Sequence, residues 1–338
     1  DGVFVRRIPV QTAWREPKRS FERLRFTFLA TMTLCEIVRS NRIDIVHVLS
    51  YPFCLVARIA MALCENVKWV YDLRSGPIEV RDKPSLKYGL VRAILKLESR
   101  LFDATFVIDD NVRNRVLGDN SKAFLVPLGT DLQFFKPATR NRRGLSRHGI
   151  HERDLIVVYS GSLNAARKLS NLILAFRRAC TEVRNLRLVV LGEGDDLNHL
   201  KSLSQRLSIS DRVFFLGYVD YREVPRFLSA ADIAVSYVPI FPAFDLQPPL
   251  KTIEYLACSL AVIATSTTGN RRFVAHEWNG LLTEDDPKSL SESIIRLSRD
   301  AALRESLSQR ARGSVKNYDW KTIIEERVLP AYQEILRM

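Results

Sequence analysis

Residues 247–265 constrain the fold of this chain more than any other segment. The double proline at 248–249 stands at a position where proline is tolerated, just before a helix and in its first turn. The segment predicts an extended entry, a short amphipathic helix over residues 250–258 and a buried β-branched strand over residues 260–264. The first backbone N–H groups of a helix have no partner within it and attract anions. Glu254 lies one turn further in, so this helix start can offer amides to a phosphate and a carboxylate to sugar hydroxyls.

Strand and helix patterns alternate along almost the whole chain. Buried strands are expected over residues 45–49, 67–71, 104–108, 123–127, 155–160, 186–191, 213–215 and 233–236. Helices are expected over residues 51–63, 85–102, 111–117, 169–181, 196–207, 222–229 and near 287–300. This alternation predicts mainly parallel sheets covered by helices. The fold class is therefore α/β, with two Rossmann-like doubly wound domains and a ligand cleft between them at the carboxyl ends of the strands.

The chain of 338 residues is long enough for two domains. The first domain is expected over residues 1–140 and the second over residues 141–318. Phe135-Lys-Pro137 and the polar run over residues 138–147 are typical of a linker. Gly280 is expected in a loop, and a last helix rich in Glu, Leu and Ile is expected over residues 319–338.

The formal net charge of +13, with a pI of about 9.7, favours a negatively charged binding partner. Nucleic acid, an anionic membrane and a phosphorylated substrate each attract such a chain. No nucleic-acid motif is present and aromatic residues are not interleaved with the basic ones, so we expect no nucleic-acid partner. Residues 18–25 are basic and residues 26–34 are apolar. This pattern fits an anionic membrane surface, and it equally fits a helix packed on the first sheet with a solvated end.

The sequence shows no pattern typical of a membrane span, a signal peptide, a disulfide framework or a metal site. The longest apolar stretches, residues 26–38 and 48–64, fall short of the roughly 20 residues of a membrane span and contain Glu36 and Arg58. The first residues show no signal peptide. The five cysteines show no C-x-x-C spacing, and no cluster of His and Cys is typical of a metal site. We expect reduced core thiols, no metal and a cytoplasmic protein, with peripheral attachment to the inner face of a membrane as an open alternative.

Glycines follow several of the expected strands, at points where a ligand can approach the backbone. Gly161 and Ser162 end the first strand of the second domain, and Arg167 and Lys168 come just before the next helix. Two cations and free backbone N–H groups in this position would stabilise a leaving diphosphate. The alternative is a tight turn with solvated basic residues.

Two further glycine turns occupy the same place after the next two strands. Gly192 and Glu193 form one of them, for which a plain strand-to-helix loop is an equal alternative. Gly217, Tyr218 and Val219 form the other, where the backbone could pair with the edge of a base while Tyr218 packs near it. The alternative is again a simple turn.

In the first domain, polar residues lie near the ends of two strands. His47 is interpreted as a packing residue, because a lone histidine in a strand is more often structural than catalytic. Asp72 and Arg74 follow the strand over residues 67–71. They either face the reacting sugar or pair with each other on a loop, and both interpretations stay open.

Taken together, these stretches resemble the retaining glycosyltransferases of family 4, which have the GT-B fold. The resemblance covers nearly the whole chain and is strongest over residues 104–282. The matching motifs, in order, are Asp-Ile-Val-His47; Val-Pro-Leu-Gly-Thr-Asp131 with Phe135-Lys-Pro137; Tyr-Ser-Gly161-Ser-Leu with Arg167-Lys168; Val-Leu-Gly-Glu-Gly194; Asp-Arg-Val-Phe-Phe-Leu-Gly-Tyr-Val219; Ala-Ala-Asp-Ile233; Pro-Leu-Lys-Thr-Ile-Glu-Tyr-Leu-Ala257; and Trp-Asn-Gly-Leu-Leu282. Each motif is weak alone, but their order and spacing are specific.

The resemblance implies roles for individual residues. Arg167, together with Lys168, would hold the donor diphosphate, and Glu254 would bind the nucleotide ribose. The expected catalytic residues are Arg167, Lys168 and Asp72. The expected donor-binding residues are Gly161, Ser162, Gly192, Glu193, Gly217, Tyr218, Val219, Leu250, Lys251, Thr252 and Glu254. The resemblance further implies retention without a metal, no cofactor beyond the nucleotide-sugar donor, and a last helix that crosses back to the first domain.

The chain departs from the family pattern at four places. Leu246 stands where the first glutamate of the family's Glu-x7-Glu motif is expected. The usual Gly-x-Pro after the helix is Ser259-Leu260-Ala261 here. A histidine often found near the reacting centre is absent at residues 70–74. No first strand–helix unit with a glycine-rich loop is visible before Val3, so the first domain is expected to be incomplete at its start.

We therefore expect a metal-independent, retaining glycosyltransferase. It would move a sugar from a nucleoside-diphosphate sugar to a glycan or lipid-linked acceptor, in the synthesis of a cell-surface polysaccharide or glycolipid. Leu246 and the missing first unit motivate the alternative of a non-catalytic subunit that binds a nucleotide sugar or a partner transferase. A sugar-nucleotide epimerase of the same fold fits less well, because its acid and base carboxylates are not evident.

Overall fold

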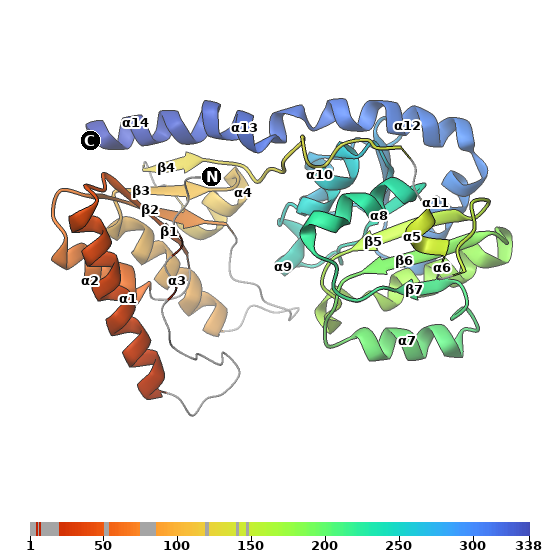
Figure 1. Cartoon of the computed structure of the whole chain (residues 1–338), viewed down its shortest axis with the longest axis horizontal. Coiled ribbons are helices and arrows are strands. Elements are labelled where there is room, and N and C mark those ends of the chain that lie inside the picture. The colour runs from red at the N-terminus through yellow and green to blue at the C-terminus, as the bar shows by residue number, and fades with distance from the viewer. Residues whose placement is uncertain are drawn as a thin grey trace. The chain divides into compact units, whose positions relative to one another are not determined.

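The structure is a computed structural model that describes residues 20–50, 54–74, 86–118, 122–139, 142–146 and 149–338, together with Val5 and Arg7. The chain divides into two compact units (Figure 1). Unit 1 contains the described residues up to Val126 and the final segment Glu326–Met338, and the described part of unit 2 is Pro127–Glu325. The expectation of a missing first strand–helix unit concerns positions outside the described residues.

Unit 1 is a parallel sheet with helices. Its elements are α1 (Ser20–Ser40), β1 (Ile45–Leu49), α2 (Leu55–Leu63), β2 (Lys68–Leu73), α3 (Leu86–Leu101), β3 (Ala104–Val107), α4 (Asp110–Val112), the π-helical turn η1 (Arg113–Leu117), β4 (Ala123–Leu125) and α14 (Leu329–Arg337). The described strands form a four-stranded sheet in the order β1-β2-β3-β4. Because β2 and β3 lie inside the sheet, nearly all of their residues are buried and most of them are apolar.

The strand register of unit 1 brings Asp72 and His47 onto one face of the sheet. Asp72 pairs with Leu49 of β1 and with Phe106 of β3, and His47 lies two residues before Leu49 on the same face. Helix α14 lies on this face, since the Tyr332 ring stacks on Phe106 with ring centroids 5.5 Å apart. The last segment of the chain is therefore part of unit 1.

Unit 2 follows the same strand–helix alternation. Its elements are α5 (Arg143–Ser146), β5 (Leu155–Ser160), η2 (Ala165–Arg167), α6 (Ser170–Glu182), β6 (Leu186–Leu191), α7 (Leu197–Arg206), β7 (Val213–Phe215), η3 (Tyr221–Glu223), α8 (Val224–Ala230), β8 (Ile233–Ser236), α9 (Pro242–Asp245), α10 (Leu250–Ala257), β9 (Ala261–Thr265), η4 (Asn270–Arg272), β10 (Gly280–Thr283), α11 (Pro287–Arg299), α12 (Ala301–Ser314), η5 (Lys316–Tyr318) and α13 (Trp320–Ile323). The π-helical turn η6 (Ile324–Val328) then leads into α14.

The sheet of unit 2 is parallel, with the order β10-β9-β8-β5-β6-β7. Strands after β5 are added on one side as far as β7, and the chain then returns to the other side of β5 with β8. This reversal is the topological switch point of a doubly wound sheet, beside which ligands bind at the carboxyl ends of the strands. Alternate residues of β5 serve two cores, because Val157 and Tyr159 face one layer of helices and Ile156 and Val158 the other.

The predicted α/β class with two parallel-sheet domains is confirmed. The segment interpreted as a linker contributes residues to the core of unit 2. Phe135 is fully buried, and Leu145 and Ile150 are buried in the same core of unit 2. The chain passes between the units at Val126 and Pro127, earlier than the predicted boundary at residue 140. The residues between Phe135 and Leu145 are mostly polar, so no local pattern indicated that this segment packs in a core.

Gly280 does not lie in a loop as predicted. It begins β10 and pairs with Val262 of β9. A Cβ at Gly280 would lie 2.9 Å from the Val262 carbonyl oxygen, so the close approach of the two strands requires glycine here. A glycine at the start of a four-residue strand resembles a turn in sequence, which explains the error.

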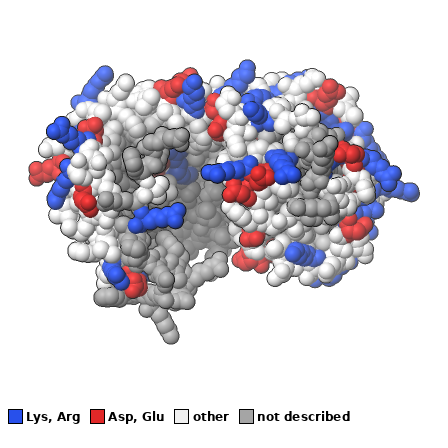
Figure 2. All heavy atoms as spheres, in the orientation of Figure 1, with Lys and Arg blue, Asp and Glu red and all other residues white. Residues whose placement is uncertain are grey.

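The predictions about cysteines and membrane spans can be compared with the structure directly. All five cysteines are buried free thiols, as expected. Among the described helices, none combines the length and apolar character needed to cross a bilayer. On the face shown in Figure 2, Lys and Arg are interspersed with Asp and Glu, so the described residues of this face carry no continuous patch of one sign.

Candidate active site

The loops after β5, β6 and β7 meet at one edge of the unit 2 sheet. The Gly192 N–H donates to the Gly217 carbonyl at 2.8 Å, and the Gly161 N–H donates to the Leu191 carbonyl at 3.0 Å. The Leu163 N–H donates to the Glu193 carbonyl at 2.8 Å, which ties the first two loops together. The three predicted glycine turns therefore form one continuous backbone surface.

Glycine is required where two of these loops touch. A Cβ at Gly192 would lie 1.9 Å from the Gly161 carbonyl oxygen, and Gly192 has a φ of 136°. Both the space and the backbone conformation exclude an L side chain. Gly161 itself has a φ of 147° and leaves the strand end open to an approaching ligand.

The helix α10 begins beside this surface, as the double proline predicted. Pro249 occupies its N-cap position and offers no side-chain cap to the first N–H groups of the helix. The Thr252 N–H donates to the Pro249 carbonyl at 3.0 Å. Lys251 lies in the first turn, and its ammonium is 4.0 Å from the centre of the Tyr159 ring. The ammonium also donates to the Tyr237 carbonyl at 3.1 Å and would lie 3.6 Å from a Cβ at Gly161.

The predicted cations reach the same region from the loop after β5. The Arg167 guanidinium lies 4.4 Å from the centre of the Phe244 ring, and the Lys168 ammonium lies 4.6 Å from that of Phe241. Burial lowers the pKa of Lys251 well below its ordinary value of 10.5, and the charge of Arg167 lowers it further. An anion bound between Arg167 and Lys251 would offset both effects and favour the charged ammonium.

Glu254 completes this cluster one turn along α10. Its side chain is buried, it accepts a hydrogen bond from Tyr221, and it lies near Lys251. Burial raises the pKa of Glu254 to about 7, although the bond from Tyr221 and the charge of Lys251 act in the opposite direction. The carboxyl group thus has polar partners, and its protonation changes close to neutral pH.

Glu254→Gln is expected to stabilise the unliganded protein more at pH 8 than at pH 5. A folded-state pKa of about 7, above the ordinary 4.5, means that the folded state favours the protonated group. The stability that the wild type gains from protonation of Glu254 is fully present below pH 4.5, and it is lost as the pH rises through 7. It amounts to roughly 3 kcal/mol, because one pKa unit corresponds to about 1.4 kcal/mol.

Urea unfolding of the wild type and of Glu254→Gln at pH 5, 6, 7 and 8 measures this dependence. The exposed Glu152→Gln substitution is the matched control and should show no such trend. A stability difference between Glu254→Gln and the wild type that stays constant from pH 5 to pH 8 contradicts the assignment.

Other predicted donor-binding residues have structural partners. The Thr252 hydroxyl is fully buried and bonds with Ser236 at 2.6 Å and with Asn270 at 2.8 Å, so it holds α10 in place. The Tyr218 N–H, expected to meet a base edge, donates to the Glu193 carboxylate at 3.1 Å. Leu250 remains exposed at the helix start.

The remaining predicted positions line the edges of the loop surface. Ser162 is exposed beside Gly161, and Tyr218 keeps 72% of its surface exposed, which leaves its ring available to a flat ligand. Val219 packs partly against the core of unit 2. Asp245, next to Leu246, accepts hydrogen bonds from the Thr268 backbone at 2.9 Å and from its hydroxyl at 2.8 Å, so it fastens the turn before α10.

Asp72 belongs to unit 1 and pairs with its neighbour. The Arg74 Nε lies 2.7 Å from the Asp72 carboxylate, and His47 Nε2 lies 2.9 Å from it. Pairing with Arg74 was one of the two interpretations left open. The His47 ring packs against Phe106 and Tyr332, as predicted for a packing residue, and it also contacts the Asp72 carboxylate. Among the described residues, no group of His, Cys, Asp and Glu has the arrangement of a metal site.

Sequence reasoning missed the aromatic residues that surround the cations. Tyr159, Tyr237 and Phe244 contact Lys251 or Arg167, and Tyr221 bonds with Glu254. The positions of Tyr159 and Tyr237, at or just after the carboxyl ends of β5 and β8, could have identified them. Tyr221 lies in a short turn with no spacing that relates it to Glu254.

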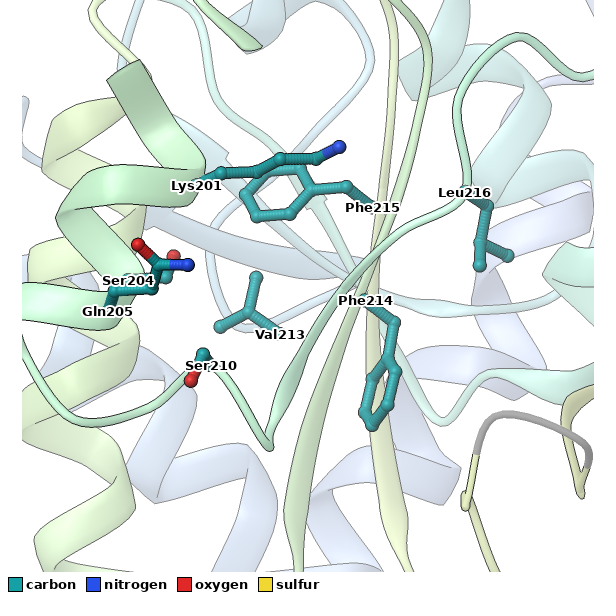
Figure 3. A pocket seen from close by; sticks show the side chains of 8 residues that line it. All are labelled: Lys201, Ser204, Gln205, Ser210, Val213, Phe214, Phe215 and Leu216. Carbon is teal, nitrogen blue, oxygen red and sulfur yellow. The ribbon is translucent and has the colours of Figure 1, made fainter. Parts of the chain in front are cut away.

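A hollow of about 270 Å³ lies elsewhere on unit 2 (Figure 3). It is lined by Lys201, Ser204, Gln205, Ser210, Val213, Phe214, Phe215 and Leu216. Lys201 and Phe215 lie on one side of strand β7 in this view, and Phe214 lies on the other. None of the predicted site residues lines it, so we do not identify it with the candidate active site.

Comparison with known proteins gives matches along both units. A family model described as "Glycosyl transferases group 1" matches residues 143–314, and one described as "Glycosyl transferase 4-like domain" matches residues 1–129. The N-acetyl-alpha-D-glucosaminyl L-malate synthase of Bacillus anthracis is 23% identical over 306 residues, which are 89% of this chain and 76% of that protein. The D-inositol 3-phosphate glycosyltransferase of Salinispora tropica is 25% identical over 294 residues, which are 82% of this chain and 60% of that protein.

Solved structures match the fold over nearly the whole chain. A glycosyltransferase from Rickettsia africae has a TM-score of 0.73 at 18% identity, covering 95% of this chain and 83% of its own. The Anabaena protein HepE, in complex with UDP and glucose, has a TM-score of 0.74 at 17% identity, covering 97% of this chain and 83% of its own. At these identities the likeness concerns the fold, which is that of two parallel-sheet units.

Proposed function

The chain belongs to the family of glycosyl transferases group 1, and from this premise we propose that it transfers a sugar from a nucleoside-diphosphate sugar to an acceptor hydroxyl. The observation that carries the proposal is the cluster of Arg167, Lys251 and Glu254 beside the open backbone of Gly161. A diphosphate needs cations and free amides, and a ribose needs a carboxylate. Unit 2 offers all three at one edge of its sheet.

Each part of this cluster has a distinct task in the proposed reaction. The amides at the start of α10 and the cations Arg167 and Lys251 bind the diphosphate and stabilise the charge that develops as it leaves. Lys168 adds positive charge from the rim, since it is exposed. Glu254 binds the ribose hydroxyls, and Tyr218 offers its exposed ring to the base.

We propose that the transfer retains the anomeric configuration and needs no metal, because the cations of the chain can supply the charge for the leaving group. The acceptor is proposed to be a glycan or a lipid-linked group bound by unit 1. Two relatives carry acceptors in their names, L-malate and inositol 3-phosphate, and both are hydroxylated anions. They are the first acceptors to test.

Incubation with a panel of nucleoside-diphosphate sugars and these two acceptors is expected to give a product with the donor's anomeric configuration. Activity should persist in the presence of EDTA. NMR of the anomeric proton, read before the product equilibrates, distinguishes the two outcomes. An inverted product, or a strict need for a divalent cation, contradicts this part of the proposal.

A peripheral position on a membrane is a separate proposal that rests on α1. Leu24, Phe28 and Met32 repeat every four residues and are 67%, 64% and 50% exposed, with Arg23 and Arg25 beside them. An apolar stripe flanked by cations suits an anionic lipid surface. Co-sedimentation with anionic but not with neutral vesicles tests this, and equal sedimentation with both overturns it.

A non-catalytic subunit remains the second candidate, favoured by Leu246 in place of the expected glutamate. Such a protein would bind a nucleoside diphosphate without transferring or hydrolysing its sugar. The same assay separates the two functions, because binding together with turnover supports the enzyme, and binding without turnover in every donor and acceptor combination supports the subunit.

A further inference from the structure

Four side chains form a connected chain of contacts on one face of the unit 1 sheet. Tyr332 of α14 bonds to His47 of β1, with 2.5 Å between the hydroxyl oxygen and Nδ1. His47 Nε2 lies 2.9 Å from the Asp72 carboxylate, and Arg74 Nε lies 2.7 Å from the same group. The contacts join residues that are up to 285 positions apart in sequence.

These contacts are consistent with one direction for each hydrogen bond. Burial raises the pKa of Tyr332, and the charge of Asp72 raises it further, so the phenol keeps its proton and donates to Nδ1. In the arrangement in which the ring accepts at Nδ1, its own proton is on Nε2 and is donated to Asp72. Both ring nitrogens of His47 are therefore engaged, and its ring has one orientation.

The two ends of this chain differ in exposure. The Asp72 side chain is 8% exposed, whereas that of Arg74 is 27% exposed. Asp72 is at the carboxyl end of β2, the edge at which parallel sheets bind ligands. Of this pair, Arg74 is the better placed to touch a substrate, and Asp72 acts by holding the guanidinium.

We propose that Tyr332, His47 and Asp72 are positioning residues that orient the Arg74 guanidinium toward an oxyanion of the acceptor. The inference rests on the proposed transferase function and assigns to Arg74 the recognition of the acceptor, a hydroxylated compound that carries a carboxylate or a phosphate. A guanidinium binds both groups with two parallel hydrogen bonds, which gives orientation as well as affinity. Orientation matters because the acceptor hydroxyl must meet the anomeric carbon in one geometry.

In this arrangement, helix α14 supplies the Tyr332 hydroxyl that orients His47. Its Tyr332 ring stacks on Phe106, and its hydroxyl reaches His47. Phenylalanine at position 332 would keep the stacking and lose the hydroxyl. Tyr332→Phe therefore separates the positioning role from simple packing of the helix.

Binding of inorganic phosphate and of L-malate, the two oxyanion probes, is measured by NMR titration of the wild type and of variants. Arg74→Ala is expected to weaken the affinity of the preferred probe about 100-fold, the effect of a lost charge-assisted pair. Tyr332→Phe is expected to weaken it about 10-fold, the effect of one lost hydrogen bond that orients the site. Tyr318→Phe, which removes a hydroxyl from a ring packed against Phe273 in unit 2, is the matched control and should change nothing.

The ¹⁵N shifts of His47 provide a readout that a merely structural role would not move. The wild type should show a protonated Nε2, and Tyr332→Phe should mix the two tautomers while the melting temperature stays within about 2 °C. Arg167→Ala should leave the unit 1 site unchanged, so anion binding at the donor site is recognised by its loss in that variant. Probe binding that Arg74→Ala leaves intact, or tautomers that Tyr332→Phe leaves unchanged, overturns the inference.

The proposed function and this inference fail in different ways. If no nucleoside diphosphate binds unit 2 but both predicted changes in unit 1 occur, the donor proposal fails and the oriented anion site stands. If nucleoside-diphosphate binding and transfer are found but Arg74→Ala leaves the apparent KM for the acceptor unchanged, the transferase stands and the acceptor assignment falls.

Discussion

Arg167→Ala is expected to lower the turnover number for sugar transfer about 100-fold, the usual effect of removing one preorganised group that stabilises a developing negative charge. The guanidinium is partly buried over the Phe244 ring and lies near Lys251. Partial burial strengthens its interaction with a leaving diphosphate. Because this charge grows as the sugar–phosphate bond breaks, the loss should appear mainly in kcat.

The matched control is Arg184→Ala, which removes an exposed arginine from the same unit. Arg167→Lys should recover part of the lost rate, since it restores the charge without the planar fork of donors. Initial rates with saturating donor give the comparison. A kcat for Arg167→Ala within a factor of two of the wild type would refute the role of this residue.

Gly192→Ala is expected to destabilise unit 2 by about 4 kcal/mol, through steric overlap and backbone strain together. The new Cβ would lie 1.9 Å from the Gly161 carbonyl oxygen, and an L residue would have to adopt a φ of 136°. The melting temperature should fall by roughly 10 °C. The fraction that stays folded should bind the donor poorly, because the loops after β5 and β6 must separate.

Gly313→Ala provides the opposite result in the same unit. Gly313 lies in α12, and a Cβ there would meet no atom within 4 Å. Alanine inside a helix is favoured over glycine by roughly 0.5–1 kcal/mol. Calorimetry of both variants should therefore show a large loss at position 192 and a small gain at position 313, whereas similar effects at the two positions would contradict the close loop contact.

Local patterns in the sequence were sufficient for the architecture and for the start of α10. The double proline and the apolar run after it predicted a helix and a strand, and the structure has α10 over Leu250–Ala257 and β9 over Ala261–Thr265. Glycines after β5, β6 and β7 predicted loops open to a ligand, and these loops are in contact. Such features succeed because their cause, steric freedom at glycine and restriction at proline, acts within a few residues.

Long-range partners were beyond the reach of local patterns. The polar run near residue 140 was interpreted as a linker, and the local pattern did not show that Phe135 and Ile150 on either side of it belong to one core. The bond between His47 and Tyr332 depends on how α14 returns to unit 1. A residue's neighbours in space decide its chemistry, and sequence spacing did not predict them.

Calorimetric titration with UDP, GDP, ADP, CDP and dTDP measures whether Arg167, Lys251 and Glu254 bind one nucleoside diphosphate. At least one diphosphate should bind the wild type, and Lys251→Met and Arg167→Ala should each weaken its affinity at least 10-fold, while Lys201→Met at the edge of unit 2 should not. Failure of all five to bind, or equal affinities in the wild type and both site variants, would contradict the account.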